Sequence, residues 1–172
     1  EKCRLLGDSQ PPWSALSMYR YMEQYGAVSL GSVYTFGLIG IWDLMDDWSV
    51  QVPQTPQQQG IKIETREQAL RVLADWELRR ITWLPFYGAD TKNKLLVKMA
   101  KDWNVNGVII HLNRGCEGTG IGQMENRMAL ADAGIPVLTY EGNMGDSREV
   151  DMVQTLERID AFMESLGQKK SA

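Results

Sequence analysis

The chain has 172 residues, which is enough for one full hydrophobic core and predicts a single domain. Its formal net charge of −4 gives no sign of a nucleic-acid or anionic-membrane partner, and its apolar runs are too short to span a bilayer. The two cysteines are too few for a disulfide framework, so we expect a cytoplasmic protein. Because the sequence starts at Glu1 without a methionine and enters a predicted strand almost at once, we also expect residues 1–172 to be the C-terminal domain of a larger protein.

The first forty residues predict a strand, a helix and a second strand. Ser14 is a plausible N-cap for the helix, and Gly26 follows its last residue. The expected elements are a strand over 3–6, a turn over 7–12, a helix over 14–25, a strand over 27–33 and a loop over 34–40.

The middle of the chain has fewer strand signals. Residues 41–63 are the least regular part, and the prolines within 52–60 indicate a loop. Thr65 and Gln68 resemble a capping box that begins a helix ending near Arg80. A further helix is expected over residues 90–103.

The C-terminal third alternates strands and helices again. The β-branched run at residues 107–111 is typical of a buried parallel strand, and a polar, glycine-rich loop at 112–118 follows it. The remaining sequence predicts a helix over 123–133 that ends at Gly134, a strand over 135–140 and a final helix over 149–166.

This alternation predicts an α/β fold with an open, doubly wound parallel sheet of about four strands, Rossmann-like or flavodoxin-like, because parallel strands need helical crossovers. The carboxyl ends of such strands meet at one edge of the sheet, where open α/β folds bind their ligands. The site is therefore expected at the loops that follow the strands, which are residues 7–13, 34–40, 112–118 and 141–148.

Cys116 is the strongest functional signal. It lies between the strand at 107–111 and the helix at 123–133, within a glycine-rich polar loop. A helix N-terminus favours the thiolate, which is the form of cysteine that attacks electrophiles and binds metals. We therefore interpret Cys116 as functional and Cys3, at the start of a strand, as structural.

Other candidates lie on the same expected edge. His111 is the only histidine and ends a strand five residues before Cys116; it is either a structural residue or half of a Cys–His pair. Glu141 follows the last strand as a proton donor or a supporting partner, whereas Asp146 is better interpreted as a turn residue. The group Tyr34, Thr35 and Phe36 either walls a substrate pocket or fills the core.

The glycines at 115, 118, 120 and 122 are a weak indication of a phosphate-binding loop. Their spacing matches neither the Walker pattern nor the usual dinucleotide fingerprint, but it suits a loop whose backbone a bulky ligand approaches closely. A flavin mononucleotide site is disfavoured because residues 7–12 lack a Ser/Thr-rich phosphate loop.

Several motifs resemble the 2-hydroxyacyl-CoA dehydratase and benzoyl-CoA reductase family, with the greatest similarity to the B subunit of benzoyl-CoA reductases. The resemblance covers nearly the whole chain and corresponds to the C-terminal portion of a family subunit. Its motifs are Asn113-Arg-Gly-Cys-Glu-Gly118, Gly122-Gln-Met-Glu-Asn-Arg127, Gly134-Ile-Pro-Val-Leu138, Glu141-Gly-Asn-Met144, Asp146-Ser-Arg148 and the closing segment 158–166.

The resemblance implies a [4Fe–4S] cluster bound by three cysteines. Cys116 matches one of them, the other two are expected in sequence outside this chain, and Cys3 matches no ligand motif. It also implies a paired homologous subunit, an ATP-hydrolysing partner that delivers low-potential electrons, and an acyl-CoA substrate. Within this scheme we assign His111 and Glu141 as candidate proton donors; the candidate substrate-binding residues are Tyr34, Thr35, Phe36, Asn113, Arg114 and Glu117.

The main hypothesis is a domain of a benzoyl-CoA reductase-type iron–sulfur subunit that reduces an aromatic acyl-CoA ring to a dienoyl-CoA. Two alternatives stay open: a 2-hydroxyacyl-CoA dehydratase subunit that works through a ketyl radical, and a non-catalytic docking domain in which Cys116 is inert. We expect no catalysis from residues 1–172 alone, because one cysteine does not hold a cluster.

Overall fold

The computed structural model describes residues 1–39, 42–78 and 89–171. Four parallel strands form its main sheet: β1 (Cys3–Asp8), β2 (Ala27–Ser32), β5 (Gly107–Asn113) and β6 (Val137–Gly142). The strand order is β2-β1-β5-β6, so the chain moves outward from β1 to β2 and then returns to continue on the other side. This arrangement confirms the doubly wound α/β fold, with the direction of winding changing between β1 and β5.

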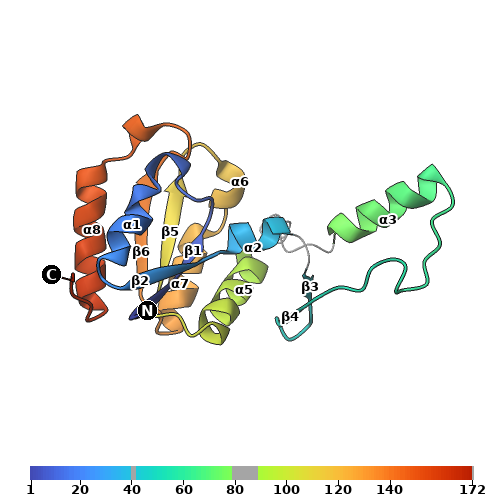
Figure 1. Ribbon diagram of the computed structural model, residues 1–172, viewed down its shortest axis with the longest axis horizontal. Coiled ribbons are helices and arrows are strands. Elements are labelled where there is room, and N and C mark those ends of the chain that lie inside the picture. The colour runs from blue at the N-terminus through green and yellow to red at the C-terminus, as the bar shows by residue number, and fades with distance from the viewer. Residues whose placement is uncertain (40–41, 79–88, 172) are drawn as a thin grey trace.

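Helices cover both faces of the sheet (Figure 1). Helices α1 (Ser17–Glu23) and α8 (Met152–Ser165) pack on one face, and α5 (Ala89–Asp102) and α7 (Gln123–Asp132) on the other. Successive residues of a strand point to opposite faces, so Leu5 and Ile109 belong to the first core while Leu6 and Ile110 belong to the second. Both faces of the central strands are therefore apolar, as a buried parallel sheet requires.

Residues 42–78 form an arm beside the sheet (Figure 1). A short hairpin of β3 (Asp43–Leu44) and β4 (Val50–Gln51) packs against the second core through Trp42 and Trp48. Helix α3 (Arg66–Leu78) follows and buries none of its residues. Its predicted capping box is confirmed, because the N–H of Gln68 donates to Thr65 Oγ1 (3.2 Å) and the N–H of Thr65 to Gln68 Oε1 (3.0 Å). The predicted end of this helix, at residues 79–80, lies outside the described residues.

The predicted loop at 34–40 is wrong for its described part. Helix α2 spans Val33–Ile39, and Ser32 caps it by accepting the N–H of Thr35 at Oγ (3.0 Å). Ser14, by contrast, is not a cap: its hydroxyl donates to the carbonyl of Asn143 (3.0 Å), within a 3₁₀ turn over Trp13–Ala15. A serine acts as a cap only where an unpaired backbone N–H of the following helix lies within reach of its side chain. Sequence alone does not show that Ser32 meets this condition and Ser14 does not.

Strand ends also differ from prediction. Strands β1, β5 and β6 end at Asp8, Asn113 and Gly142, beyond the expected ends at 6, 111 and 140. Strand β6 begins at Val137 rather than Ile135, because the N–H of Ile135 still closes helix α7 through the carbonyl of Leu130 (2.9 Å). The longer strands carry polar residues to the edge of the sheet, and a short helix α6 (Glu117–Gly120) occupies the glycine-rich segment.

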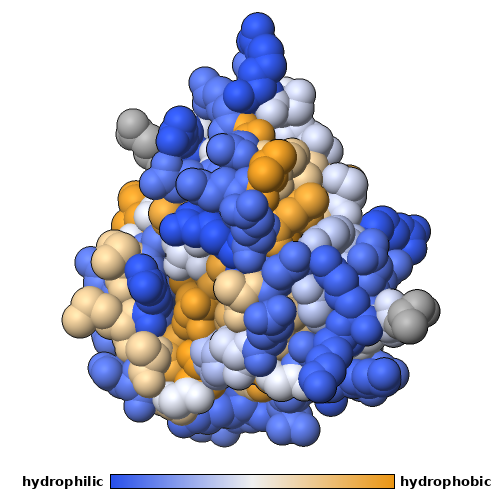
Figure 2. All heavy atoms as spheres, turned by 90° about the vertical axis from the view of Figure 1, so that its left-hand side faces the viewer, coloured by the Kyte–Doolittle hydropathy of each residue, from blue (hydrophilic) through white to orange (hydrophobic). Residues whose placement is uncertain are grey.

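Apolar side chains are exposed on the outer side of α1 and α8. Figure 2 views the molecule from this side and shows apolar atoms between hydrophilic ones. Val153 on α8 is 72% exposed, and Leu16, just before α1, is 45% exposed. None of the described helices is long and apolar enough to cross a membrane.

A cluster of polar side chains joins α1, α8 and the C-terminal tail. Asp160 on α8 accepts hydrogen bonds from the hydroxyls of Tyr21 (2.8 Å) and Tyr25 (2.6 Å) on α1, and it forms an ion pair with Lys170 (3.1 Å). Burial and the neighbouring carboxylate raise the pKa of Tyr25 to about 12, so its hydroxyl stays a donor at neutral pH. The cluster fixes the tail against the first core.

We predict that Tyr25→Phe lowers the free energy of unfolding by about 2 kcal/mol, because a hydrogen bond to a charged acceptor is lost. Urea denaturation followed by circular dichroism measures the change. Tyr34→Phe, which removes a hydroxyl from a half-buried tyrosine outside this cluster, is the matched control and should change stability by less. Equal effects of the two variants would contradict a specific contribution from the Asp160 cluster.

Candidate functional site

Cys116 lies where the sequence predicts it, between β5 and α7 at the carboxyl edge of the sheet. It is a free, partly exposed thiol that immediately precedes α6. The backbone N–H of Thr119 lowers the pKa of this thiol most, the side chains of Gln10 and Thr119 act in the same direction, and partial burial opposes them. The surroundings therefore favour the thiolate, which is the metal-binding form of cysteine.

A buried ion pair lies in the same part of the edge. Lys92 Nζ, from α5, is 3.2 Å from Asp8 Oδ2 at the end of β1, and the two side chains are only 3% and 1% exposed. Asn126 Nδ2, from α7, donates to the same carboxylate oxygen (2.7 Å). Three separate elements therefore meet at one charged group.

A second set of hydrogen bonds connects this pair to the Cys116 loop. Ser9 Oγ donates to the carbonyl of Thr119 (3.2 Å) and accepts from Gln123 Nε2 (2.6 Å). Thr119 Oγ1 donates to Gln10 Oε1 (2.6 Å), and the side chains of Ser9 and Gln10 are both buried. Ser9 has a φ of 68°, in the left-handed region, so the chain turns sharply as β1 ends.

Asn113, a predicted substrate-binding residue, is buried and bonded within the protein. Its Oδ1 accepts the N–H of Gly115 (3.0 Å) and of Met144 (3.3 Å), while its Nδ2 donates to Gln10 Oε1 (2.9 Å). These contacts join the loops that follow β1, β5 and β6. In this arrangement the buried side chain of Asn113 holds the Cys116 loop in its conformation.

His111 is buried at the end of β5, and its ring stacks on Tyr140 with the centroids 4.8 Å apart. Its Nδ1 is 2.9 Å from the carbonyl of Gln10, so this nitrogen carries the proton and Nε2 is the acceptor. Nε2 has no hydrogen-bonding partner among the described residues. Burial lowers the pKa of His111, although the carbonyls of Gln10 and Gly142 oppose this, and His111 is not among the groups that lower the pKa of Cys116.

Arg114 and Glu141 form the exposed part of the site. Arg114 Nη2 and Glu141 Oε2 are 2.6 Å apart, with side chains 59% and 57% exposed. The hydrogen bond and charge of Arg114 lower the pKa of Glu141, so this carboxylate is ionised at neutral pH. The geometry places Glu141 beside the Cys116 loop, as expected, in a form that orients Arg114.

The aromatic candidates lie on α2, after the edge strand β2. Phe36 stacks on Trp42, with the ring centroids 4.9 Å apart, and meets Trp103 edge-on, so it fills the second core. Thr35 is exposed next to its cap Ser32, and Tyr34 is half-buried. Glu117 begins α6, but its side chain lies outside the described part of the structure.

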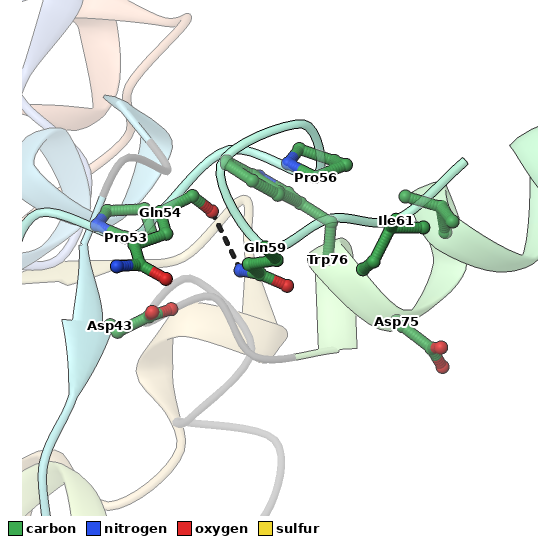
Figure 3. Close-up of a pocket in the computed structure, with 9 residues that line it drawn as sticks. Asp43, Pro53, Gln54, Pro56, Gln59, Ile61, Asp75 and Trp76 are labelled. Carbon is green, nitrogen blue, oxygen red and sulfur yellow. Dashed lines mark hydrogen bonds between the residues drawn. The ribbon is translucent and has the colours of Figure 1, made fainter. Parts of the chain in front are cut away.

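A small cavity lies away from this edge, within the arm (Figure 3). It has a volume of about 60 Å³ and lies between the proline-containing segment 53–61 and α3, with Trp76 on one wall. Gln59 Nε2 closes part of the segment by donating to the carbonyl of Gln54 (2.8 Å). No cysteine or histidine lines this cavity, so it offers none of the chemistry found around Cys116.

Sequence reasoning missed the polar residues around Cys116, which are the buried Asp8, Ser9, Gln10, Lys92, Gln123 and Asn126 and the partly buried Thr119. One signal was available: Lys92 has helical spacing with the apolar residues Leu95, Leu96 and Met99, so it lies on the buried face of α5. A charged residue on such a face needs a buried partner, which the polar end of β1 supplies.

The comparison with known protein families decides the family. The family described as 2-hydroxyglutaryl-CoA dehydratase, D-component, matches residues 1–166. The chain belongs to this family. Membership places it among the subunits of 2-hydroxyacyl-CoA dehydratase and benzoyl-CoA reductase-type enzymes, which act on CoA esters. A search of individual curated proteins gave no match.

Within this family member, a metal cluster has one clear donor. Cys116 is a partly exposed thiol whose pKa is lowered, as a ligand requires, whereas Cys3 is buried in the first core with its pKa raised by burial. Among the described residues, no group of three cysteine, histidine or carboxylate side chains is arranged to hold a metal. Among the described residues, Cys116 is therefore the thiol suited to bind a metal, and these residues alone do not form a complete metal site.

We predict that the stability of the folded chain falls below about pH 6.5 in part because of His111. Its pKa is lower in the folded chain than in the unfolded chain, so the unfolded chain binds the proton first and stability is lost as the pH falls. His111→Gln keeps a neutral donor but does not titrate. Urea denaturation at pH 7.5 and pH 5 should show a larger loss for the wild type, and equal losses would contradict the prediction.

Proposed function

We propose that this chain is a domain of the iron–sulfur subunit of a benzoyl-CoA reductase-type enzyme, with Cys116 as one ligand of a [4Fe–4S] cluster. The observation that carries the proposal is the placement of Cys116 in a family member. The thiol lies at the carboxyl edge of a doubly wound sheet, among N–H and polar groups that lower its pKa. Soft thiolates in such surroundings are typical iron–sulfur ligands.

The other two ligands, in this proposal, come from cysteines outside residues 1–172. When bound, the cluster would supply low-potential electrons to the acyl-CoA. The N–H groups of Gly118 and Thr119, which lower the pKa of Cys116, would stabilise negative charge on its sulfur and so adjust the reduction potential. The electrons come from an ATP-hydrolysing partner, and a homologous subunit pairs with this one in the cytoplasm.

Arg114 is the best-placed residue to bind an acyl-CoA. Its guanidinium is exposed two residues before Cys116 and is oriented by Glu141, and a guanidinium binds phosphate or thioester oxygens well. Tyr34 and Thr35 supply further contacts in this proposal, together with Glu117. Phe36 and Asn113 act indirectly in this proposal: Phe36 packs α2 against the second core, and Asn113 shapes the Cys116 loop.

The proton supply is proposed to involve His111 and Glu141 in different ways. Reduction of an aromatic ring to a diene takes up two electrons and two protons. His111 is neutral and carries its proton on Nδ1, so it influences the site through Gln10. Glu141 is ionised next to Arg114, so it can donate a proton only after it has separated from Arg114 and taken up a proton from solvent.

A 2-hydroxyacyl-CoA dehydratase is the second candidate, favoured by the description of the matching family. Here a ketyl radical forms on the substrate, water is lost and the electron is returned. The two reactions differ in net electron use: the reductase consumes two electrons per product, whereas the dehydratase consumes none. Titration of a stoichiometric reductant against product, with benzoyl-CoA and a 2-hydroxyacyl-CoA as substrates, separates them.

We predict that Cys116→Ala removes cluster iron and the reduced-state electron paramagnetic resonance signal. The experiment uses the complete subunit that contains this chain, prepared anaerobically with its partner subunit. Cys3→Ala is the matched control and should keep both, because Cys3 lies in the first core. An unchanged iron content in Cys116→Ala would overturn the proposal and favour the docking-domain alternative.

We predict that Glu141→Gln lowers kcat/KM for the acyl-CoA about tenfold, mainly through KM, because Arg114 loses the group that orients it. Steady-state kinetics of the complete enzyme measures this effect, and Glu157→Gln, a change of an exposed carboxylate on α8, is the control. A loss of kcat of about 100-fold or more with KM unchanged would instead identify Glu141 as the proton donor.

A further inference from the structure

Helix α6 has little intrinsic helical stability. It has four residues, Glu117-Gly-Thr-Gly120, of which two are glycines. Glycine is a poor helix former, and the first turn of any helix is costly to form, so this segment has no intrinsic tendency to be helical. Its conformation beside Cys116 must come from contacts with the rest of the fold.

Those contacts converge on Thr119. Its carbonyl accepts hydrogen bonds from Lys92 Nζ (3.3 Å) and from Ser9 Oγ (3.2 Å), and its hydroxyl donates to Gln10 Oε1 (2.6 Å). The donors come from α5 and from the end of β1, two elements that are packed in the second core. Hydrogen bonds from α5 and from the end of β1 therefore fix the position of Thr119 within α6.

The buried ion pair is the anchor of this arrangement. Lys92 and Asp8 are almost completely excluded from water, and Asn126 supplies a further hydrogen bond to Asp8. A buried ion pair is weak evidence for stability, because apolar residues of similar size often stabilise a fold as well. An ammonium group held by Asp8 does, however, place a donor at the carbonyl of Thr119, which an apolar residue does not.

We propose that Lys92 and Asp8 are positioning residues that fix Thr119 and thereby the short helix α6, which begins directly after Cys116. The ion pair sets the position of the ammonium group, the ammonium group and Ser9 hold the carbonyl of Thr119, and Thr119 holds α6. The functional consequence of this positioning rests on the proposed role of Cys116 as a cluster ligand. The positioning of Thr119 by Lys92 and Asp8 is independent of that role.

The first test uses the 172-residue chain without any cluster. The double variant Asp8→Asn/Lys92→Met removes both charges and keeps an acceptor for Asn126, so no buried charge is left unpaired. Amide hydrogen exchange, measured by NMR, should become about tenfold faster at Gly120 and Ile121, whose N–H groups close the turn of α6, and stay unchanged at Ile109 in the core. Lys94→Met, which breaks an exposed ion pair with Asp90 on the same helix, is the matched control and should change none of these rates.

Exchange at Gly120 and Ile121 that stays at the wild-type rate in the double variant would overturn the proposal. If the double variant does not fold, Asp8→Asn/Lys92→Gln takes its place, because it also leaves no buried charge unpaired and keeps a polar group at both positions. It should then accelerate exchange at the same two amides, by less than tenfold, and unchanged rates would again overturn the proposal.

The second test separates positioning from the proposed function. In the complete subunit with its partner, Asp8→Asn/Lys92→Met should retain cluster iron but shift the g-values and the midpoint potential of the cluster, because the N–H groups near one ligand move. Fast exchange together with an unaffected cluster in both this variant and Cys116→Ala would remove the ligand role and leave the positioning intact. Loss of the cluster in Cys116→Ala with unchanged exchange in the double variant would support the ligand role of Cys116 and overturn the positioning role of Lys92 and Asp8.

Discussion

The central place of β1 in the sheet is the constraint on which the rest of the structure depends. Because β1 pairs in parallel with β2 on one side and with β5 on the other, the chain must cross the sheet in both directions, and helices cover both faces. The carboxyl ends of β1 and β5 are then adjacent at the point where the winding changes direction. Ser9 and Gln10 reach the Cys116 loop for this reason, although more than a hundred residues separate them from it in sequence.

The site at this edge combines two environments. Arg114 and Glu141 are exposed, so each can exchange its partner for a ligand. The side chains of His111, Asn113, Lys92 and Asp8 are buried and bind other groups of the protein. Cys116 lies between them, partly exposed. The thiol at this boundary is open to solvent on one side, and the polar groups on its other side favour the thiolate.

Much of the fold could be predicted because its strands and long helices have strong local patterns. The β-branched run that forms β5 and the amphipathic spacing of α5 and α8 each determine an element within a short window. Helix α2 could not, because its seven residues depend on a cap from Ser32 that competes with the strand before it. For the site, the position of Cys116 followed from the alternation of strands and helices. The contacts of Thr119 did not, because they link residues that only the tertiary fold brings together.

The two thiols of this chain lie at opposite ends of the sheet. Cys3 begins β1 two residues before the position that pairs with Gly107, and Cys116 follows the last residue of β5, so about the length of β5, roughly 20 Å, separates them. A disulfide requires Cα atoms within about 7 Å, so the folded chain cannot join its own cysteines. On exposure to oxygen, Cys116 can therefore only form sulfur oxyacids or cross-link to another molecule, which makes mixed disulfides and covalent dimers the expected damage products of this domain.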